Sequence, residues 1–133
     1  MIEFSVERRV SVEQFRDLLV RSTLGERRPI DEPETLAGMV ANGNLLVTAW
    51  KEELLVGVAR SVTDFSYCCY LSDLAVDAAC QREGIGKELV RLTREQLPAG
   101  CSVILLSAPQ ATTYYPGIGF EQHPSAWVCK AGG

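Results

Sequence analysis

The chain has 133 residues, of which 47% are hydrophobic and 23% charged, and its net charge is −4. This size and composition predict one folded domain over residues 1–133 and exclude a disordered chain. The acidic balance argues against a nucleic-acid partner, and no apolar run reaches the roughly 18 residues that a membrane span needs.

The first half of the sequence predicts a strand, two helices and three more strands. Alternation over residues 2–7 indicates a short strand, and Ser11 with Gln14 forms the pattern of a capping box at the start of a helix. Pro33 suits the first turn of a second helix, which the pair Asn42 and Gly43 ends. Short connections between the strands that follow predict an antiparallel meander over 45–50, 54–62 and 67–76.

The second half predicts a helix, a buried parallel strand and a β-rich end. A helix is expected over 84–97, where four side chains recur at helical spacing: Ile85, Leu89, Leu92 and Gln96. The apolar segment 103–107 is expected to be buried on both faces, and therefore parallel to the strand before the helix. A short helical turn near 111–115 precedes two last strands, 119–123 and 126–130. The predicted fold is α/β, of the α+β type.

Cysteine usage and the N-terminus both indicate the cytoplasm. The five cysteines have no Cys-x-x-Cys spacing and lie mostly in apolar stretches, which is typical of free thiols in a reducing compartment. The first ten residues, MIEFSVERRV, lack the charged-then-apolar pattern of a signal peptide. We therefore expect a cytoplasmic protein without a membrane partner.

Residues 80–89, CQREGIGKEL, place two glycines just before the predicted helix. Glycines let the backbone approach a ligand, and the first turn of a helix leaves N–H groups free to bind a phosphate or pyrophosphate. The spacing excludes two common motifs: a dinucleotide-binding loop would need glycine in place of Leu89, and a P-loop would need it in place of Gln81. The remaining pattern is Gln/Arg-x-x-Gly-x-Gly/Ala, which Gln81, Gly84 and Gly86 match.

With this pattern the sequence resembles the GNAT superfamily of N-acetyltransferases. Segment 70–80, YLSDLAVDAAC, is similar to the family's central strand. Segment 112–123, TTYYPGIGFEQH, resembles its aromatic-Tyr-x-x-x-Gly-Phe signature. The order of the predicted elements also matches, so the resemblance spans essentially the whole chain. It implies a mixed, mostly antiparallel sheet flanked by helices, with a splayed parallel strand pair at its centre.

The resemblance implies a transferase that moves the acetyl group of acetyl-CoA directly to a primary amine, without a metal. Backbone groups of the central strand would pair with the pantetheine amides, and those of the glycine loop would bind the pyrophosphate. Tyr115 aligns with the family's proton donor to the departing thiolate, and a packed aromatic is the other interpretation of this residue. The cofactor-binding residues implied in this way are Leu74, Ala75, Val76, Gln81, Arg82, Glu83, Gly84, Ile85, Gly86 and Lys87.

The proton acceptor for the attacking amine is less constrained by the sequence. Some relatives carry a Glu on the central strand where this chain has Tyr70, and a phenol is a poor base. Asp73 is the nearest carboxylate on the strand, and it could accept the proton directly or through water, or be a structural carboxylate. Asp64 and Tyr67 are further candidates, whereas His123, beside a proline, reads as a turn residue.

Several functions stay open at this point. Arg27 and Arg28 lie where relatives wall the acceptor site, so they could pair a substrate carboxylate or phosphate, or they could be solvated loop charges. The acceptor is a small-molecule or polypeptide amine. A non-catalytic acyl-CoA-binding module is the alternative, because the strand lacks the Glu. A toxin-like enzyme acting on charged tRNA is disfavoured by the acidic charge. A homodimer is compatible with the sequence.

Overall fold

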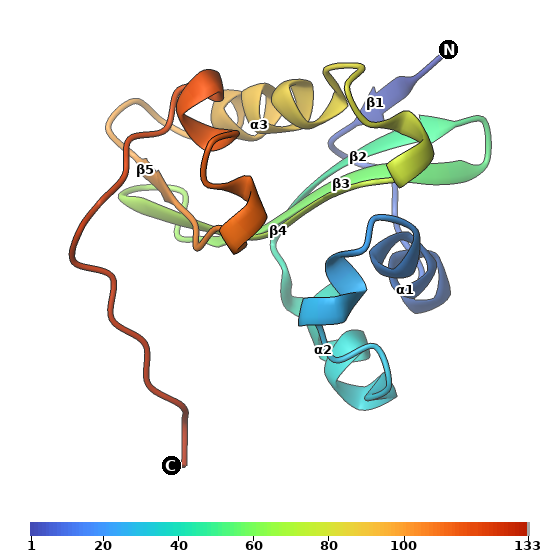
Figure 1. Ribbon diagram of the computed structural model, residues 1–133, viewed down its shortest axis with the longest axis horizontal. Helices are drawn as coiled ribbons and strands as arrows, with labels where there is room; N and C mark the ends of the chain where they lie inside the picture. The colour runs from blue at the N-terminus through green and yellow to red at the C-terminus, as the bar shows by residue number, and fades with distance from the viewer. Residues whose placement is uncertain (133) are drawn as a thin grey trace.

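A five-stranded sheet with the order β1-β2-β3-β4-β5 runs through the molecule (Figure 1). The computed structural model describes residues 1–132, without the side chain of Gln110. The strands are β1 (Glu3–Ser5), β2 (Leu45–Lys51), β3 (Leu54–Thr63), β4 (Cys68–Val76) and β5 (Ser102–Ile104). The first four pair antiparallel, and β5 runs parallel to β4. This mixed, mostly antiparallel sheet confirms the predicted fold class.

The sheet carries helices on both faces. The α-helices are α1 (Val12–Arg21), α2 (Pro33–Asn42) and α3 (Ile85–Glu95), and four short 3₁₀ turns are η1 (Leu24–Arg27), η2 (Ala78–Cys80), η3 (Pro109–Ala111) and η4 (Tyr115–Ile118). Helices α1 and α2 cover one face and α3 covers the other (Figure 1). The capping box at Ser11 and Gln14 is present, so the predicted start of α1 is confirmed.

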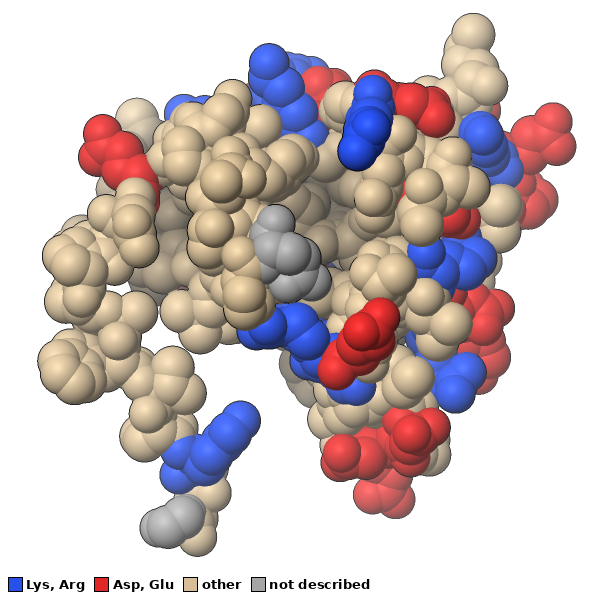
Figure 2. Space-filling view, viewed as in Figure 1, with Lys and Arg blue, Asp and Glu red and all other residues tan. Residues whose placement is uncertain are grey.

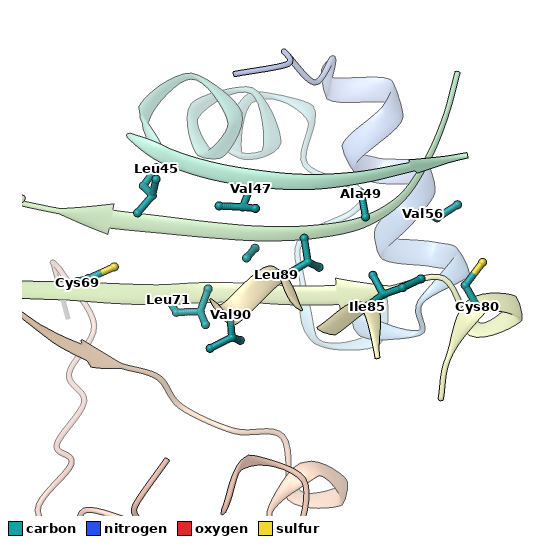
Figure 3. Packing of buried hydrophobic residues seen from close by; sticks show 11 residues of the cluster. Leu45, Val47, Ala49, Val56, Cys69, Leu71, Cys80, Ile85, Leu89 and Val90 are labelled. Carbon is teal, nitrogen blue, oxygen red and sulfur yellow. The ribbon is translucent and has the colours of Figure 1, made fainter. Parts of the chain in front are cut away.

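Two clusters of buried side chains form the core, one on each face of the sheet. The cluster under α3 comprises Leu45, Val47, Ala49, Val56, Ala59, Cys69, Leu71, Cys80, Ile85, Leu89 and Val90 (Figure 3). The cluster under α1 and α2 comprises Val10, Phe15, Leu18, Leu19, Leu36, Trp50, Leu55, Val58 and Ala75. Gly57 on β3 lets α3 pack closely, because a Cβ there would lie 3.1 Å from side-chain atoms of Ile85 and of Leu89. The N-terminal end of α3 is therefore held firmly against the sheet.

The C-terminal part of the chain departs from the sequence prediction. Of the segment 103–107, only residues 103 and 104 belong to the parallel strand β5, and Ile104 and Leu106 are 54% and 49% exposed. Burial on both faces was thus wrong, because within residues 1–132 no element pairs with the outer edge of β5. The expected strands over 119–123 and 126–130 are also wrong, since both segments lack strand structure. A β-prone segment needs a pairing partner, and an isolated hairpin is marginally stable.

Helix α3 is shorter than expected. It ends at Glu95, and Gln96, expected on its inner face, is an exposed cap residue. In the described part of the chain, no helix has the length and apolar character that crossing a bilayer requires.

Candidate active site

The segment between β4 and α3 is held at its start by an ion pair. Asp77, directly after β4, accepts a hydrogen bond from the backbone N–H of Ala79 at 2.9 Å and pairs with Arg21 of α1. Burial by itself would raise the pKa of Asp77, but the Ala79 N–H and the Arg21 guanidinium outweigh it and lower the pKa. Gln81 donates from its side-chain amide to the carbonyl oxygen of Val76 at 3.3 Å. The loop is thus anchored on the same strand that it leaves.

The first turn of α3 is open to a ligand. Gly84 is the N-cap residue with φ +80°, and no described side chain caps this end of the helix. Arg82 also has a positive φ, 68°, in the left-handed region that glycine adopts most readily. Uncapped N–H groups together with the helix dipole favour an anion at this position. The geometry therefore agrees with the anion site that the sequence predicts at Gly84, Ile85 and Gly86.

Strands β4 and β5 pair over a short distance only. Residues 68–70 of β4 pair with 102–104 of β5, and beyond Tyr70 no strand in the described chain pairs with this side of β4. On its other side, Leu74, Ala75 and Val76 pair with β3. The backbone of these three residues therefore borders the place where the parallel strands part. An extended ligand could add to this edge in the manner of a strand.

Tyr115 lies in η4, in a row of three aromatic rings. Its ring centroid is 5.3 Å from that of Tyr114 and 5.5 Å from that of Phe120, and both pairs have edge-to-face geometry. Burial, reinforced by Tyr114 and partly opposed by the charge of Arg28, raises the pKa of Tyr115. The phenol is protonated at neutral pH with or without this shift, because the ordinary pKa of tyrosine is about 10.

Gly86 packs directly under the hydroxyl group of Tyr114. A Cβ at Gly86 would overlap the hydroxyl oxygen of Tyr114 and lie 3.5 Å from its Cζ atom. Gly86 itself is buried. The sequence explains this glycine by the approach of a ligand, and the structure adds a second reason, the close approach of an aromatic side chain. No sequence signal joined the two residues, which are far apart in the chain.

Asp73 is fully buried between two arginines. One carboxylate oxygen accepts a hydrogen bond from Nε of Arg28 and the other from Nε of Arg60, both at 2.5 Å. Arg28 also donates to the carbonyl oxygen of Ser72 at 2.8 Å, and Arg60 to that of Met39 at 3.3 Å. This cluster ties the loop after η1 to β3, β4 and the end of α2. A carboxylate held by two cations and shielded from water is better suited to a structural role than to proton transfer.

Sequence reasoning missed Arg60. The signal was available, because Arg60 is a charged residue within the apolar strand LLVGVARSV, and a buried charge requires a partner. Of the two loop arginines, Arg28 lies in this cluster, whereas Arg27 is exposed. The backbone oxygen of Arg27 accepts a hydrogen bond from the guanidinium of Arg28.

The other candidate bases lie elsewhere. Asp64 is exposed and accepts from the backbone N–H groups of residues 66–68, and these bonds, led by that of Tyr67, lower its pKa. Asp64 therefore stabilises the turn between β3 and β4. His123 is exposed in the C-terminal segment, 2.9 Å from the hydroxyl of Ser125. Among the described residues, no group of three or more His, Cys, Asp or Glu side chains could hold a metal ion.

The comparisons with known proteins identify the family of this chain. The model of the acetyltransferase (GNAT) domain matches residues 25–132, so the chain belongs to the GNAT acetyltransferase family. It is 36% identical over 76 residues to GCN5-related N-acetyltransferase 2, chloroplastic, of Arabidopsis thaliana, and 33% identical over 76 residues to histone acetyltransferase TAP1 of Glycine max. Each alignment covers 56% of this chain, and 30% and 33% of the respective relative.

Solved structures share the fold over nearly the whole chain. The GNAT family acetyltransferase SP0256 from Streptococcus pneumoniae TIGR4 superposes with a TM-score of 0.78 at 22% identity, covering 98% of this chain and 99% of that one. An aminoglycoside N-acetyltransferase solved with CoA superposes with a TM-score of 0.73 at 17% identity, covering 98% and 94%. At these identities the likeness concerns the fold.

Proposed function

We propose that the protein transfers the acetyl group of acetyl-CoA to a primary amine of a small-molecule or polypeptide acceptor by direct attack. One observation carries the proposal. The uncapped first turn of α3 follows β4 after the loop of residues 77–84, and the edge of β4 is open at Leu74 to Val76. A ligand with an anionic end and an extended amide-bearing arm fits this combination of an anion site and an open strand edge. Acetyl-CoA is such a ligand, and a solved neighbour of the same fold holds CoA.

The backbone would supply most of the cofactor contacts. The N–H groups of residues 82–87 would bind the pyrophosphate, and the main chain of Leu74, Ala75 and Val76 would pair with the pantetheine arm. Gln81 fixes the loop to β4 through its bond to Val76. Because backbone donors carry the binding, the side chains of Arg82, Glu83 and Lys87, all exposed, are free to vary without loss of the site.

The chain's own groups would assist two moments of the reaction. As the amine nitrogen bonds to the thioester carbon, backbone donors near Leu74 to Val76 would stabilise the negative charge that develops on the carbonyl oxygen. As the carbon–sulfur bond breaks, Tyr115 would donate its proton to the leaving thiolate. At neutral pH the phenol of Tyr115 carries the proton that this step needs, because the ordinary pKa of tyrosine is about 10 and burial moves it upward.

The amine must lose a proton in the reaction, and two positions on β4 bear on where it goes. Asp73 as its acceptor stays a prediction, and the two short bonds to Arg28 and Arg60 favour a positioning role for it instead. Tyr70, where relatives have a Glu, is 41% exposed at the point where β4 and β5 part. Water at this exposed position could accept the proton. A cytoplasmic location and a homodimer likewise stay predictions.

A non-catalytic acyl-CoA-binding module is the second candidate. The observation that favours it is the pairing of Asp73 with Arg28 and Arg60, which occupies the nearest strand carboxylate. This interpretation shares the cofactor site with the first and differs only in turnover.

A single assay distinguishes the acetyltransferase from the non-catalytic acyl-CoA-binding module. Acetyl-CoA would be offered with a panel of amines, and the release of free CoA measured alongside the thermal shift that CoA produces. The panel takes its classes from the family's relatives: an aminoglycoside, as for the solved neighbours, and a lysine-containing histone peptide, as for TAP1. Release of CoA with one class supports the enzyme. A thermal shift without release of CoA from any class supports the binding module. If CoA produces no thermal shift and no amine causes its release, the proposed function is contradicted.

A further inference from the structure

Tyr114 stands between the predicted anion site and the predicted proton donor. Its hydroxyl lies on Gly86 in the first turn of α3, where no Cβ could fit, and Cγ2 of Val76 borders the same spot, 3.8 Å from the position of that Cβ. Its ring meets that of Tyr115 edge to face at 5.3 Å. One side chain thus touches both the helix end and Tyr115.

Side-chain packing restrains this part of the chain, through the aromatic rings and through Leu105 and Ile118, which pack against the core cluster under α3. Between residues 105 and 120, the described hydrogen bonds join only residues of the segment itself. Tyr115 lies between the rings of Tyr114 and Phe120, and Phe120 packs against the core cluster under α3. The place of the Tyr115 phenol therefore depends on where its two neighbouring rings are held.

We propose that Tyr114 is a positioning residue, whose contact with Gly86 sets the place of Tyr115 relative to β4. The inference rests on the proposed role of Tyr115 as proton donor. A tyrosine ring has few rotatable bonds, so a methyl group at Gly86 cannot be avoided by movement of the hydroxyl alone. The whole ring of Tyr114 must shift, and Tyr115 must shift with it. Gly86 then serves both the anion site and the alignment of the donor.

The test needs no cofactor. The chain has four tyrosines, so protein labelled with 3-fluorotyrosine should give four ¹⁹F resonances, each assigned by a Tyr→Phe variant. We expect the Gly86→Ala substitution alone, with Tyr114 retained, to displace the Tyr115 resonance from its position in the parent. In a Tyr114→Phe background, which lacks the overlapping oxygen, the same Gly86→Ala change should displace it much less. Resonances of Tyr67 and Tyr70 should keep their positions and so show that the fold is retained.

A second glycine of the same loop provides the matched control. Gly84 has φ +80°, and no atom lies within 4 Å of the place that a Cβ would take there. Gly84→Asn should therefore leave the Tyr115 resonance in place, because Asn tolerates this backbone conformation. Should Gly86→Ala fail to fold, Tyr114→Leu removes the ring instead and should also displace the Tyr115 resonance. An unmoved Tyr115 resonance in the folded variant, or equal displacement in both backgrounds, overturns the proposal.

Turnover gives an independent readout that separates this inference from the proposed function. With acetyl-CoA at saturation, Gly86→Ala should lower kcat by about tenfold or more, since a displacement of about 1 Å can be that costly. The Gly86→Ala, Tyr114→Phe double variant should return to within about twofold of Tyr114→Phe alone. If the parent binds no CoA, the proposed function fails while the resonance test still decides on the Tyr114 contact. If CoA binds and kcat is not restored in the double variant, Tyr114 does not position the donor.

Discussion

The part of the chain before residue 98 and the part after residue 100 differ sharply in how they are packed. Both core clusters consist of residues up to Val90, and the last buried residue is Thr93. From Cys101 to residue 132, no described side chain is buried. The candidate site takes its anion-binding turn and strand edge from the first part and Tyr115 from the second. A well-packed surface is thus combined with a candidate donor in a segment that has no fully buried side chain among the described residues.

A groove marks the boundary between the two parts. It has a volume of about 660 Å³ and lies between the end of α3, β5 and the turn before residue 121. Its lining includes Arg94, Leu97, Cys101, Val103 and Phe120. The groove lies at the opposite end of α3 from the uncapped first turn, so we do not assign it to the acetyl-transfer site. Beyond it, the described C-terminal segment up to residue 132 projects from the body (Figure 2).

The largest effect should come from breaking the buried cluster of the well-packed part. Asp73→Asn leaves Arg28 and Arg60 without their counter-charge, and loss of one partner of a buried ion pair costs about 3–5 kcal/mol of the free energy of unfolding. Urea denaturation would measure it. Asp31→Asn is the matched control, because Asp31 meets Arg16 at 3.8 Å on the surface and its loss should change little. A parent-like stability of Asp73→Asn would show that the cluster does not hold the loop.

Tyr115 should dominate the chemistry of the second part. Tyr115→Phe keeps the ring between its two aromatic neighbours and removes the donated proton, which should lower kcat about a hundredfold with CoA affinity unchanged. Tyr114→Phe, the matched variant, should cost far less. Both are to be measured at saturating acetyl-CoA. Full turnover in Tyr115→Phe would mean that water or another group protonates the thiolate.

The raised pKa of Tyr115 makes a prediction about stability at alkaline pH. Burial is its main cause, so the folded chain keeps this proton to a higher pH than the unfolded chain, whose tyrosines have the ordinary pKa of about 10. The contribution of Tyr115 is complete below about pH 10 and is lost as the pH rises through the folded-state pKa. The parent should therefore lose stability more steeply than Tyr115→Phe across this range. Urea denaturation at several pH values would measure the free energy of unfolding of both proteins. An equal dependence of this free energy on pH in both would contradict the prediction.

The smallest effect is expected at the end of the chain. Trp127 and Val128 are 91% and 70% exposed, so removal of residues 123–133 should change the free energy of unfolding by no more than about 0.5 kcal/mol. Fluorescence offers a companion measurement, because Trp50 is buried and Trp127 is not. Trp127→Phe should remove the red-shifted part of the emission. A large loss of stability on truncation would mean that this segment packs against the body.

Local signals were sufficient for the first part of the fold. The capping box at Ser11, Pro33 at the start of α2 and the short connections between β2, β3 and β4 act within a few residues, and these elements formed as predicted. The glycine pattern likewise located the turn before α3, because a positive φ at Gly84 is a local property of the backbone. The comparable signals after residue 118 failed, because strand propensity becomes a strand only when another strand pairs with it.

The sequence by itself determined the family, the order of the elements up to α3 and the position of the glycine turn before α3. Those features depend on short-range spacing. Only the tertiary structure decided that Asp73 lies between Arg28 and Arg60, and that the hydroxyl of Tyr114 rests on Gly86. The physical reason is distance along the chain: these contacts join segments brought together by packing, and no local pattern records which side chains will meet there.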